Sequence, residues 1–222
     1  MSFSLLDLIF PKRCVNCQKF GSYICRDCLK KVEFIEKPVC PICQRQAVGG
    51  KTHPGCYSRY SLDGLVVVAR YRGAIRSAIR KIKYRWVTDI ESTLGDLMTD
   101  NLWKFDFPAD SVLVPIPLHP KRKRWRGFNQ AELLTKYLSK KFGSRTSDSL
   151  YRYIDTKPQV GLKKEDRRKN IKGAFRVNGD VNGCDLIVVD DVYTSGATMM
   201  EAAKVLKRAG AKTVWAMAVA LG

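Results

Sequence analysis

The sequence predicts an α/β protein in which a small cysteine-rich module precedes a mostly parallel sheet flanked by helices. From residue 65 onward, apolar β-branched runs alternate with helical patterns, as in right-handed βαβ units. Residues 11–58 instead hold seven of the eight cysteines and too few apolar side chains to bury a core. At 222 residues the chain is long enough for one α/β domain and an appendage, which we place at residues 61–222 and 1–60.

A short amphipathic helix is expected in the first ten residues. Their apolar run lacks the basic flank of a signal peptide, and Asp7 and Pro11 interrupt it. No later apolar run approaches the ~20 residues of a membrane span. We therefore expect a cytoplasmic protein, and peripheral association with the inner face of the cytoplasmic membrane stays open.

Metal-ligand side chains occur in four pairs, each with two residues between its members. The pairs are Cys14 and Cys17, Cys25 and Cys28, Cys40 and Cys43, and His53 and Cys56. Zinc prefers four such ligands in a closed tetrahedron, so the spacing predicts two structural zinc ions held by consecutive pairs. A cross-braced arrangement, in which the first and third pairs share one ion, uses the same residues and stays open. Cys184 stands alone and is expected to be a packed thiol.

The α/β part is expected to begin with a buried strand at residues 65–71, which are mostly apolar and β-branched. Ile75, Ile79 and Ile82 recur at helical spacing beneath a basic face and predict the first helix. The remaining elements follow in chain order: a helix over 90–102, a strand over 111–117 that ends in prolines, a helix over 131–142, a polar loop or hairpin over 151–180, a strand over 186–189, a helix ending near 209 and a strand over 213–221.

The strand at residues 186–189 leads into two acids, Asp190 and Asp191, which we expect to be exposed at the strand end. A loop of small and hydroxyl residues follows, made of Thr194, Ser195, Gly196, Ala197 and Thr198. Ligands of open parallel sheets bind outside the carboxyl ends of the strands. Small residues let backbone N–H groups approach a phosphate at a helix N-terminus, whereas paired carboxylates suit hydroxyl groups or Mg²⁺. A ribose 5-phosphate carrying a metal-bound pyrophosphate satisfies both halves.

The same segment excludes two common nucleotide sites, because it lacks Gly-Lys-Ser/Thr and Gly-x-Gly-x-x-Gly. An ordinary capped strand-to-helix turn is the alternative. The stretch LIVVDDVYTSGAT resembles the phosphoribosyl pyrophosphate (PRPP) signature of type I phosphoribosyltransferases. The resemblance implies that Asp190 and Asp191 are the catalytic acidic pair, that residues 194–198 hold the 5-phosphate, and that Mg²⁺ enters with PRPP.

A basic stretch follows the strand at residues 111–117. Its five cations in six positions are Lys121, Arg122, Lys123, Arg124 and Arg126. If this strand neighbours the strand at 186–189, these side chains face the same crevice and can hold a pyrophosphate. Pro115 and Pro117 stiffen the strand exit, and Gly127 allows a tight entry into the next helix. A solvated basic loop is the alternative.

Together, VPIPLHPKRKRWRGFNQAELL, KPQVGLKKEDRRKNIKGAF and the Asp-Asp loop resemble the ComF family, in order and over nearly the whole chain. Members of that family pair an N-terminal double zinc ribbon with a phosphoribosyltransferase domain. The resemblance implies a type I phosphoribosyltransferase fold, with residues 126–130 as one signature. The second signature comprises Gln159, Arg167, Asn170 and Phe175. We further expect Lys164, Arg167 and Arg168 on a flap over the pyrophosphate, with a surface hairpin that binds no ligand as the alternative.

The ComF resemblance also implies a role in natural competence, where family members support movement of single-stranded DNA into the cytoplasm. Partners would then include a competence helicase or the uptake machinery. The charge agrees, because 40 Lys and Arg against 21 Asp and Glu give a formal net charge of +19, which attracts polyanions. Cations gather near Tyr84 and Trp86 and again near Trp125, as single-strand binding requires, unless these rings lie in the core. The candidate DNA contacts are Arg80, Lys83, Arg85, Lys121, Arg122, Lys123 and Arg124.

Three functions are compatible with these patterns. The first is a PRPP-binding competence protein that also binds single-stranded DNA. The second is a metabolic phosphoribosyltransferase, in which an acceptor nitrogen attacks C1 of the ribose as Mg-pyrophosphate leaves. The third is a zinc-ribbon adaptor with a vestigial pocket. No motif for an acceptor base stands out, which argues against the second function, and the intact PRPP signature argues against the third.

Overall fold

The computed structural model describes residues 11–84, 90–156 and 163–222. Its centre is a four-stranded parallel sheet in the order β1-β6-β5-β2. These strands are β1 (Gly64–Arg70), β2 (Val112–Pro115), β5 (Asp185–Tyr193) and β6 (Thr213–Leu221). A separate antiparallel pair consists of β3 (Leu150–Arg152) and β4 (Phe175–Val177). The predicted α/β fold is confirmed, and the predicted N-terminal helix lies outside the described residues.

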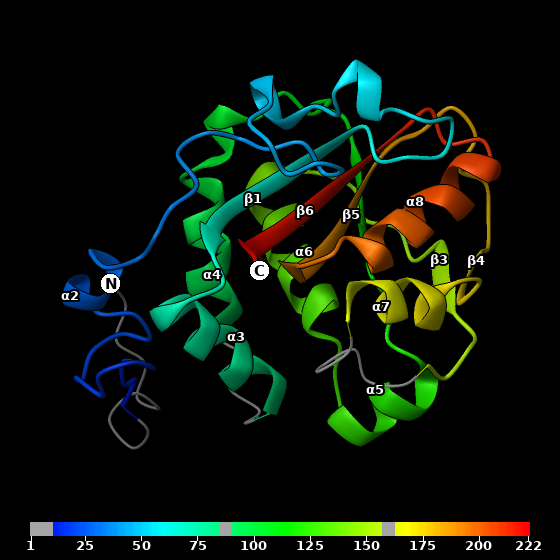
Figure 1. Cartoon of the computed structure of the whole chain (residues 1–222). Helices are drawn as coiled ribbons and strands as arrows, with labels where there is room; N and C mark the ends of the chain where they lie inside the picture. Colours follow the sequence, from blue (N-terminus) through cyan, green and yellow to red (C-terminus); the bar gives the residue numbers. More distant parts are fainter. Residues whose placement is uncertain (1–10, 85–89, 157–162) are drawn as a thin grey trace.

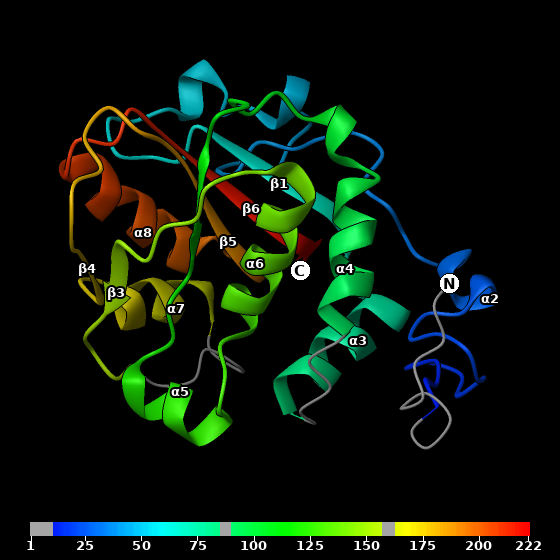
Figure 2. The ribbon, with the colours of Figure 1, turned by 180° about the vertical axis from the view of Figure 1, so that it is seen from behind.

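Helices cover both faces of the sheet (Figure 1, Figure 2). One face carries α3 (Gly73–Tyr84), α4 (Ile90–Thr99) and α6 (Gln130–Phe142). The other face carries α8 (Ala197–Arg208), together with α7 (Lys164–Ile171) and the β3–β4 pair. None of the described helices is long and apolar enough to span a membrane.

Successive side chains along a strand enter different cores. In β1, Val66 and Val68 pack with the α3, α4 and α6 side, whereas Leu65 and Val67 pack with the α8 side. Because both sides are apolar, the strands read as continuous apolar runs rather than as an alternating pattern. This burial, at ~25 cal/mol per Å² of apolar surface, is what holds the sheet between its helices.

Helix α3 shows the two-sided pattern that its sequence predicts. Ile75, Ile79 and Ile82 are buried, and Arg76 and Arg80 are exposed on the other side of the helix. The apolar stripe therefore fixes which way the helix faces, and the cations are left at the surface.

Two basic segments expected to be loops are helices. Residues 121–126 lie on α5 (Pro120–Arg126), which is capped by the His119 side chain accepting from the Lys121 N–H at 3.4 Å. Gly127 ends α5 with φ 81°, a left-handed conformation that favours glycine. Between β3 and β4, α7 is inserted into the hairpin that the sequence suggested over 151–180. Both helices are strongly polar, so periodicity could not reveal them.

Strand β5 continues four residues beyond its predicted end at Val189. Strand β6 runs alongside it to the last pair, Tyr193 with Leu221, while β2 stops where Pro115 pairs with Val189. The prediction that Asp190 and Asp191 follow the strand was therefore wrong in detail. They belong to β5, but they lie beyond the end of the neighbouring strand β2.

The cysteine-rich module repeats one backbone design. The residue after the second cysteine has a positive φ, 66° at Gln18 and 57° at Gln44, and its N–H donates to the carbonyl of the first cysteine at 2.9 Å. Ile35 and Val39 join the two halves and are buried in the core on the α8 side, so the module packs against the α/β part. Short helical turns are α2 (Arg26–Leu29), η1 (Val48–Gly50), η2 (Pro54–Cys56) and, after α4, η3 (Leu102–Lys104).

Candidate functional site

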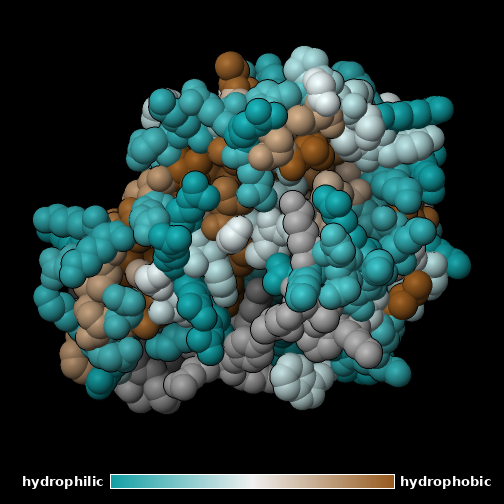
Figure 3. Space-filling view, in the orientation of Figure 1, coloured by the Kyte–Doolittle hydropathy of each residue, from teal (hydrophilic) through white to brown (hydrophobic). Residues whose placement is uncertain are grey.

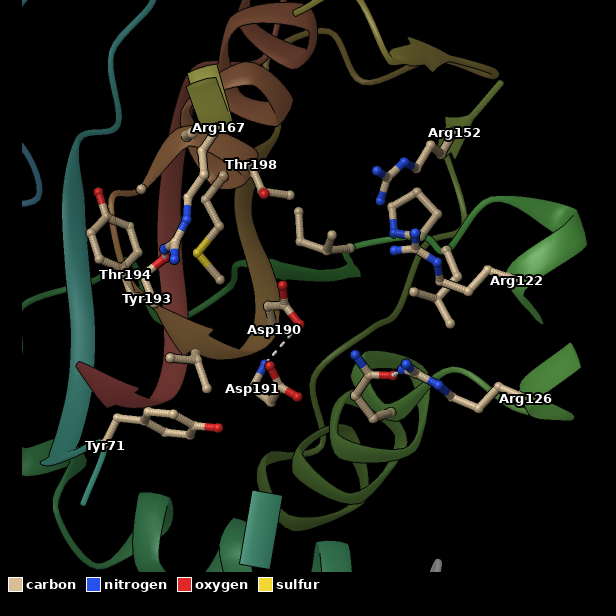
Figure 4. A pocket seen from close by; sticks show the side chains of 18 of the residues that line it. Tyr71, Arg122, Arg126, Arg152, Arg167, Asp190, Asp191, Tyr193, Thr194 and Thr198 are labelled. Atoms are coloured by element: carbon tan, nitrogen blue, oxygen red, sulfur yellow. Dashed lines mark hydrogen bonds between the residues drawn. The ribbon is translucent and has the colours of Figure 1, made fainter. Parts of the chain in front are cut away.

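A cleft of about 1010 Å³ opens beside the ends of β5 and β2, at the predicted edge of the sheet (Figure 4). Figure 3 shows a hollow near the centre of the face that it presents, with hydrophilic side chains gathered to its left. Of the predicted site residues, its lining includes Arg80, Lys121, Arg122, Arg126, Arg167, Asp190, Asp191, Thr194, Gly196, Ala197 and Thr198. Ser195, Lys123 and Arg124 lie outside this lining, and the side chains of Lys83, Arg85 and Lys164 lie outside the described part of the chain.

The predicted phosphate loop lies at the N-terminus of α8. Gly196 precedes the helix with φ 71°, and an added Cβ would collide with the Tyr193 hydroxyl, so only glycine fits there. Ala197 and Thr198 already belong to the first turn of the helix. The Ser195 hydroxyl accepts from the Ala197 N–H at 3.5 Å and thus braces the loop itself. The helix directs its first N–H groups and the positive end of its dipole toward the cleft.

The two acids lie in the middle of the cleft (Figure 4). The Asp191 N–H donates to Oδ1 of Asp190 at 2.8 Å, which fixes the first carboxylate above the strand. Asp190 is half-buried, but Asp191 is buried, so the expectation that both acids are exposed was wrong for Asp191. The error arose because β5 continues past these residues and brings Asp191 between neighbouring elements.

Two arginines face the acids from the opposite wall (Figure 4). Arg152 on β3 is 7% exposed and donates to the Thr156 hydroxyl, while Nη2 of Arg122 donates to the Thr156 carbonyl at 3.2 Å. Burial, with Arg122 nearby, lowers the pKa of Arg152 to about 10, while Asp190 and Asp155 act in the opposite direction. Two adjacent guanidinium groups, one of them desolvated, suit an anion that carries several charges.

Sequence reasoning missed Arg152. It is a single arginine in a three-residue strand, and no spacing marks it as a site residue. Other unforeseen side chains in the lining include those of Tyr71, Asp155 and Tyr193, whereas Gln130 belongs to the expected signature at residues 126–130.

The remaining predicted cations divide into two groups. Nη1 of Arg126 donates to Oε1 of Gln130 at 2.6 Å within the lining, and Nη1 of Arg167 donates to the Thr194 hydroxyl at 2.8 Å. Lys123 instead pairs with Glu132 at 2.8 Å, away from the cleft. Trp125 lies in the lining and is 72% exposed, so a core position for this ring is excluded.

The eight predicted zinc ligands gather in two sets. One comprises Cys14, Cys17, Cys25 and Cys28, the other Cys40, Cys43, His53 and Cys56, and the ligand atoms of each set lie within 4.8 Å of one another. The sequential arrangement is confirmed, and the cross-braced one is excluded. Tetrahedral zinc with bonds of about 2.3 Å to sulfur places ligand sulfurs about 3.8 Å apart, which these sets fit. No position is left for water, so both sites are suited to a structural ion.

The histidine of the second set is oriented by the backbone. Its Nδ1 atom lies 3.3 Å from Sγ of Cys43, while Nε2 of His53 lies 2.9 Å from the Gln46 carbonyl. A proton on Nε2 bonded to that carbonyl leaves Nδ1 as the metal ligand, as outer hydrogen bonds commonly arrange for zinc-binding histidines.

We expect metal analysis of the purified protein to find two zinc ions per chain, because two complete ligand sets are present. Cys14→Ser should lower the count to one. Cys184→Ser is the control, since Cys184 lies in neither set, and it should keep both ions. A count of one zinc in the unmodified protein would contradict the assignment.

Comparison with known proteins agrees with these features. Residues 5–57 match the model of a double zinc ribbon domain. The chain is 29% identical to competence protein F of Haemophilus influenzae over 227 residues, which cover 94% of this chain and 97% of that protein. It is 31% identical to DNA utilization protein YhgH of Escherichia coli over 198 residues, or 86% and 87% of the two chains. Identity to competence protein ComFC of Bacillus subtilis is 29% over 206 residues, or 84% and 79%. With its cysteine-rich module matched as a double zinc ribbon and relatives along most of its length, the chain belongs to the ComF family of competence and DNA utilization proteins.

Proposed function

We propose that the cleft binds PRPP together with Mg²⁺, or ribose 5-phosphate, and that the protein serves DNA uptake and utilization. The observation that carries the proposal is the order of chemical groups along one cleft. A loop at a helix N-terminus lies on one side, the Asp190–Asp191 pair lies in the middle, and Arg122 and Arg152 lie on the opposite wall. PRPP has the same order, because its ribose separates a 5-phosphate from a 1-pyrophosphate.

Each part of PRPP then meets a group of matching chemistry. The 5-phosphate accepts from N–H groups and hydroxyls of residues 194–198, and the ribose hydroxyls donate to Asp190 and Asp191. The pyrophosphate lies against Arg122 and Arg152, with Arg126 and Lys164 as further proposed contacts. Arg167, expected over the pyrophosphate, instead donates to the Thr194 hydroxyl and is proposed to contact PRPP at its 5-phosphate end. Mg²⁺ neutralises the pyrophosphate and is held near the two carboxylates.

A transfer reaction is the second candidate, and the guanidinium pair favours it. When an acceptor nitrogen attacks C1, the bond to pyrophosphate breaks and negative charge grows on the leaving oxygen. Arg122 and Arg152 are placed to stabilise that charge, since fixed cations in a partly dry site act more strongly than in water. Release of pyrophosphate from PRPP in the presence of candidate nitrogenous bases would identify this function.

The names of the relatives support the DNA role. Proteins called competence protein and DNA utilization protein match most of this chain. Arg76, Arg80 and Lys121 line the same cleft as the exposed ring of Trp125, which supplies the cations and the stacking surface that a single strand requires. The proposal includes a cytoplasmic location, with peripheral contact at the inner membrane face, a helicase or uptake partner, and division of the chain at residues 60 and 61.

The test is a calorimetric titration with PRPP, with and without Mg²⁺, followed by single-stranded DNA alone and in the presence of PRPP. Mg-dependent PRPP binding supports the proposal, and a coupled change in DNA affinity identifies PRPP as a regulator of DNA binding. Absence of PRPP binding would leave the zinc-ribbon adaptor with a vestigial pocket as the better description.

Removal of two cleft cations is expected to flatten the salt dependence of DNA binding. In Arg80→Gln with Lys121→Gln, the slope of log K against log salt should fall by about 0.7 per lost phosphate contact. Trp125→Ala should weaken binding about tenfold, because stacking contributes ~1–3 kcal/mol per base. Lys140→Gln, on α6 and outside the cleft lining, is the matched control. It should change neither the salt slope nor the affinity for single-stranded DNA. An unaltered slope in the double variant would place the DNA elsewhere.

A further inference from the structure

The second half of the zinc module contacts the phosphate loop directly. The Tyr193 hydroxyl donates to the Pro41 carbonyl at 2.8 Å, and Nε2 of Gln44 donates to the Thr194 carbonyl at 3.1 Å. Pro41 and Gln44 lie in the turn that Cys40 and Cys43 close, about 150 residues away in the sequence. We call residues 40–44 the second knuckle. It therefore reaches the start of the loop that α8 presents to the cleft.

We infer that the second knuckle is a positioning device for the phosphate loop, and that Gln44 sets the orientation of the Thr194–Ser195 peptide. This inference rests on the proposed binding of a 5-phosphate. In a trans peptide the carbonyl and the next N–H point in opposite directions. With the Thr194 carbonyl held toward Gln44, the Ser195 N–H points away from the knuckle, and the carbonyl cannot turn toward the ligand and repel its charge.

The surrounding contacts hold the same stretch from other sides. The Thr194 hydroxyl accepts from Arg167, and the Tyr193 carbonyl accepts from the Gly222 N–H at 2.9 Å. Tyr193 is 1% exposed, and its ring leaves space only for a glycine at position 196. The Thr194 side chain and the Tyr193 carbonyl are thus held by the α/β part of the chain, while the Thr194 carbonyl and the Tyr193 hydroxyl are held by the zinc module.

The position of Gln44 depends on the zinc ligands on either side of it. Its backbone has φ 57°, and its N–H donates to the carbonyl of Cys40, which is fully buried. A metal that ties Cys40 to Cys43 therefore holds Gln44 in place. Because binding couplings are reciprocal, a ligand on the phosphate loop should in turn tighten zinc binding at the second site and leave the first unchanged.

Gln18 offers a matched control. It follows Cys17 as Gln44 follows Cys43, with φ 66°, and in the described part of the chain its side chain makes no hydrogen bond to the phosphate loop. Replacement by alanine removes the same side chain from the same kind of backbone in both variants. Any difference between the two variants therefore comes from the contact with Thr194.

The first experiment measures, by calorimetry, the affinity of the protein for ribose 5-phosphate and, separately, for Mg-pyrophosphate. Gln44→Ala should weaken the binding of ribose 5-phosphate about fivefold, which is the value of one ordinary hydrogen bond, and should leave the binding of Mg-pyrophosphate unchanged. Gln44→Glu, which keeps the shape but replaces the donor with a carboxylate, should weaken it further. Gln18→Ala should bind both ligands as the unmodified protein does. Equal losses for both ligands in Gln44→Ala would indicate general damage to the fold and overturn the inference.

The second experiment measures zinc affinity against a chromogenic chelator. Ribose 5-phosphate should protect one of the two zinc ions from removal by the chelator. This protection should be lost in Gln44→Ala and kept in Gln18→Ala. Protection of neither ion, while ribose 5-phosphate still binds, would overturn this inference alone. If the unmodified protein binds neither ribose 5-phosphate nor PRPP, the proposed function fails and the inference fails with it.

Discussion

Asp190→Asn combined with Asp191→Asn is expected to abolish Mg-dependent PRPP binding while leaving the fold intact. The two carboxylates would accept hydrogen bonds from ribose hydroxyls and lie near the metal that PRPP carries. Each charge-assisted hydrogen bond contributes ~1.5–3 kcal/mol, so losing both charges should weaken binding by about 100-fold or more. Calorimetry with PRPP and Mg²⁺ measures the loss.

The fold should survive because asparagine has the shape of aspartate. In the double variant, Oδ1 at position 190 can still accept from the N–H at position 191, the bond that fixes the first side chain. Asp185→Asn is the matched control at the opposite end of β5, where the carboxylate pairs with Lys212 at 3.3 Å. It should bind PRPP as the unmodified protein does. Unchanged PRPP affinity in the double variant would refute the site.

Arg152→Met is expected to remove most of the affinity for Mg-pyrophosphate without lowering the free energy of unfolding. The loss should be about 10- to 100-fold, from charge-assisted hydrogen bonds of ~1.5–3 kcal/mol each. The stability should be kept or raised, because replacing a buried charge by an apolar group of similar size is often neutral or stabilising. Arg176→Met, at an exposed site on the partner strand where the arginine stacks on Tyr153 at 4.1 Å, is the control. Calorimetry and urea unfolding supply the two readouts.

Burial also gives Arg152 a pH signature. Its folded pKa of about 10 lies below the ordinary value of an arginine, so the unfolded chain holds this proton more tightly. The free-energy cost of burying the charged form is therefore present in full below about pH 10, and it disappears as the pH rises from there toward the higher pKa of the unfolded chain. A bound anion raises the pKa again, so pyrophosphate binding near pH 10 should take up a proton. Calorimetry in buffers of different ionisation enthalpy detects that uptake, which Arg152→Met should lose.

The parts of the fold that the sequence predicts are those with a local apolar pattern. Strand β1 and helix α3 have such patterns, and the structure has both. The end of β5 could not be predicted, because it depends on how far β6 extends beside it and on where β2 stops. Helices α5 and α7 carry too few apolar residues to form a stripe, so their sequences look like those of loops.

The candidate site divides in the same way. Asp190 and the loop after it are contiguous, so one short stretch of sequence contains both. Arg152 reaches the site through a separate two-stranded pair, and Gln44 reaches it from the zinc module. These two contacts depend on chain segments meeting in space, and nothing in the residues next to either one signals the partner.

The strand order has a consequence for how the protein is made. In the sheet formed by the described residues, β1 pairs with β6 and β2 pairs with β5, and these two central strands come later in the chain than both edge strands. Until residues 185–221 have left the ribosome, β1 and β2 lack their neighbours in the sheet and can form only isolated bridges to earlier residues, such as Phe34 with Ala69 and Thr146 with Leu113. Apolar strands that are only partly paired invite misassociation, so the growing polypeptide should engage a chaperone before it folds.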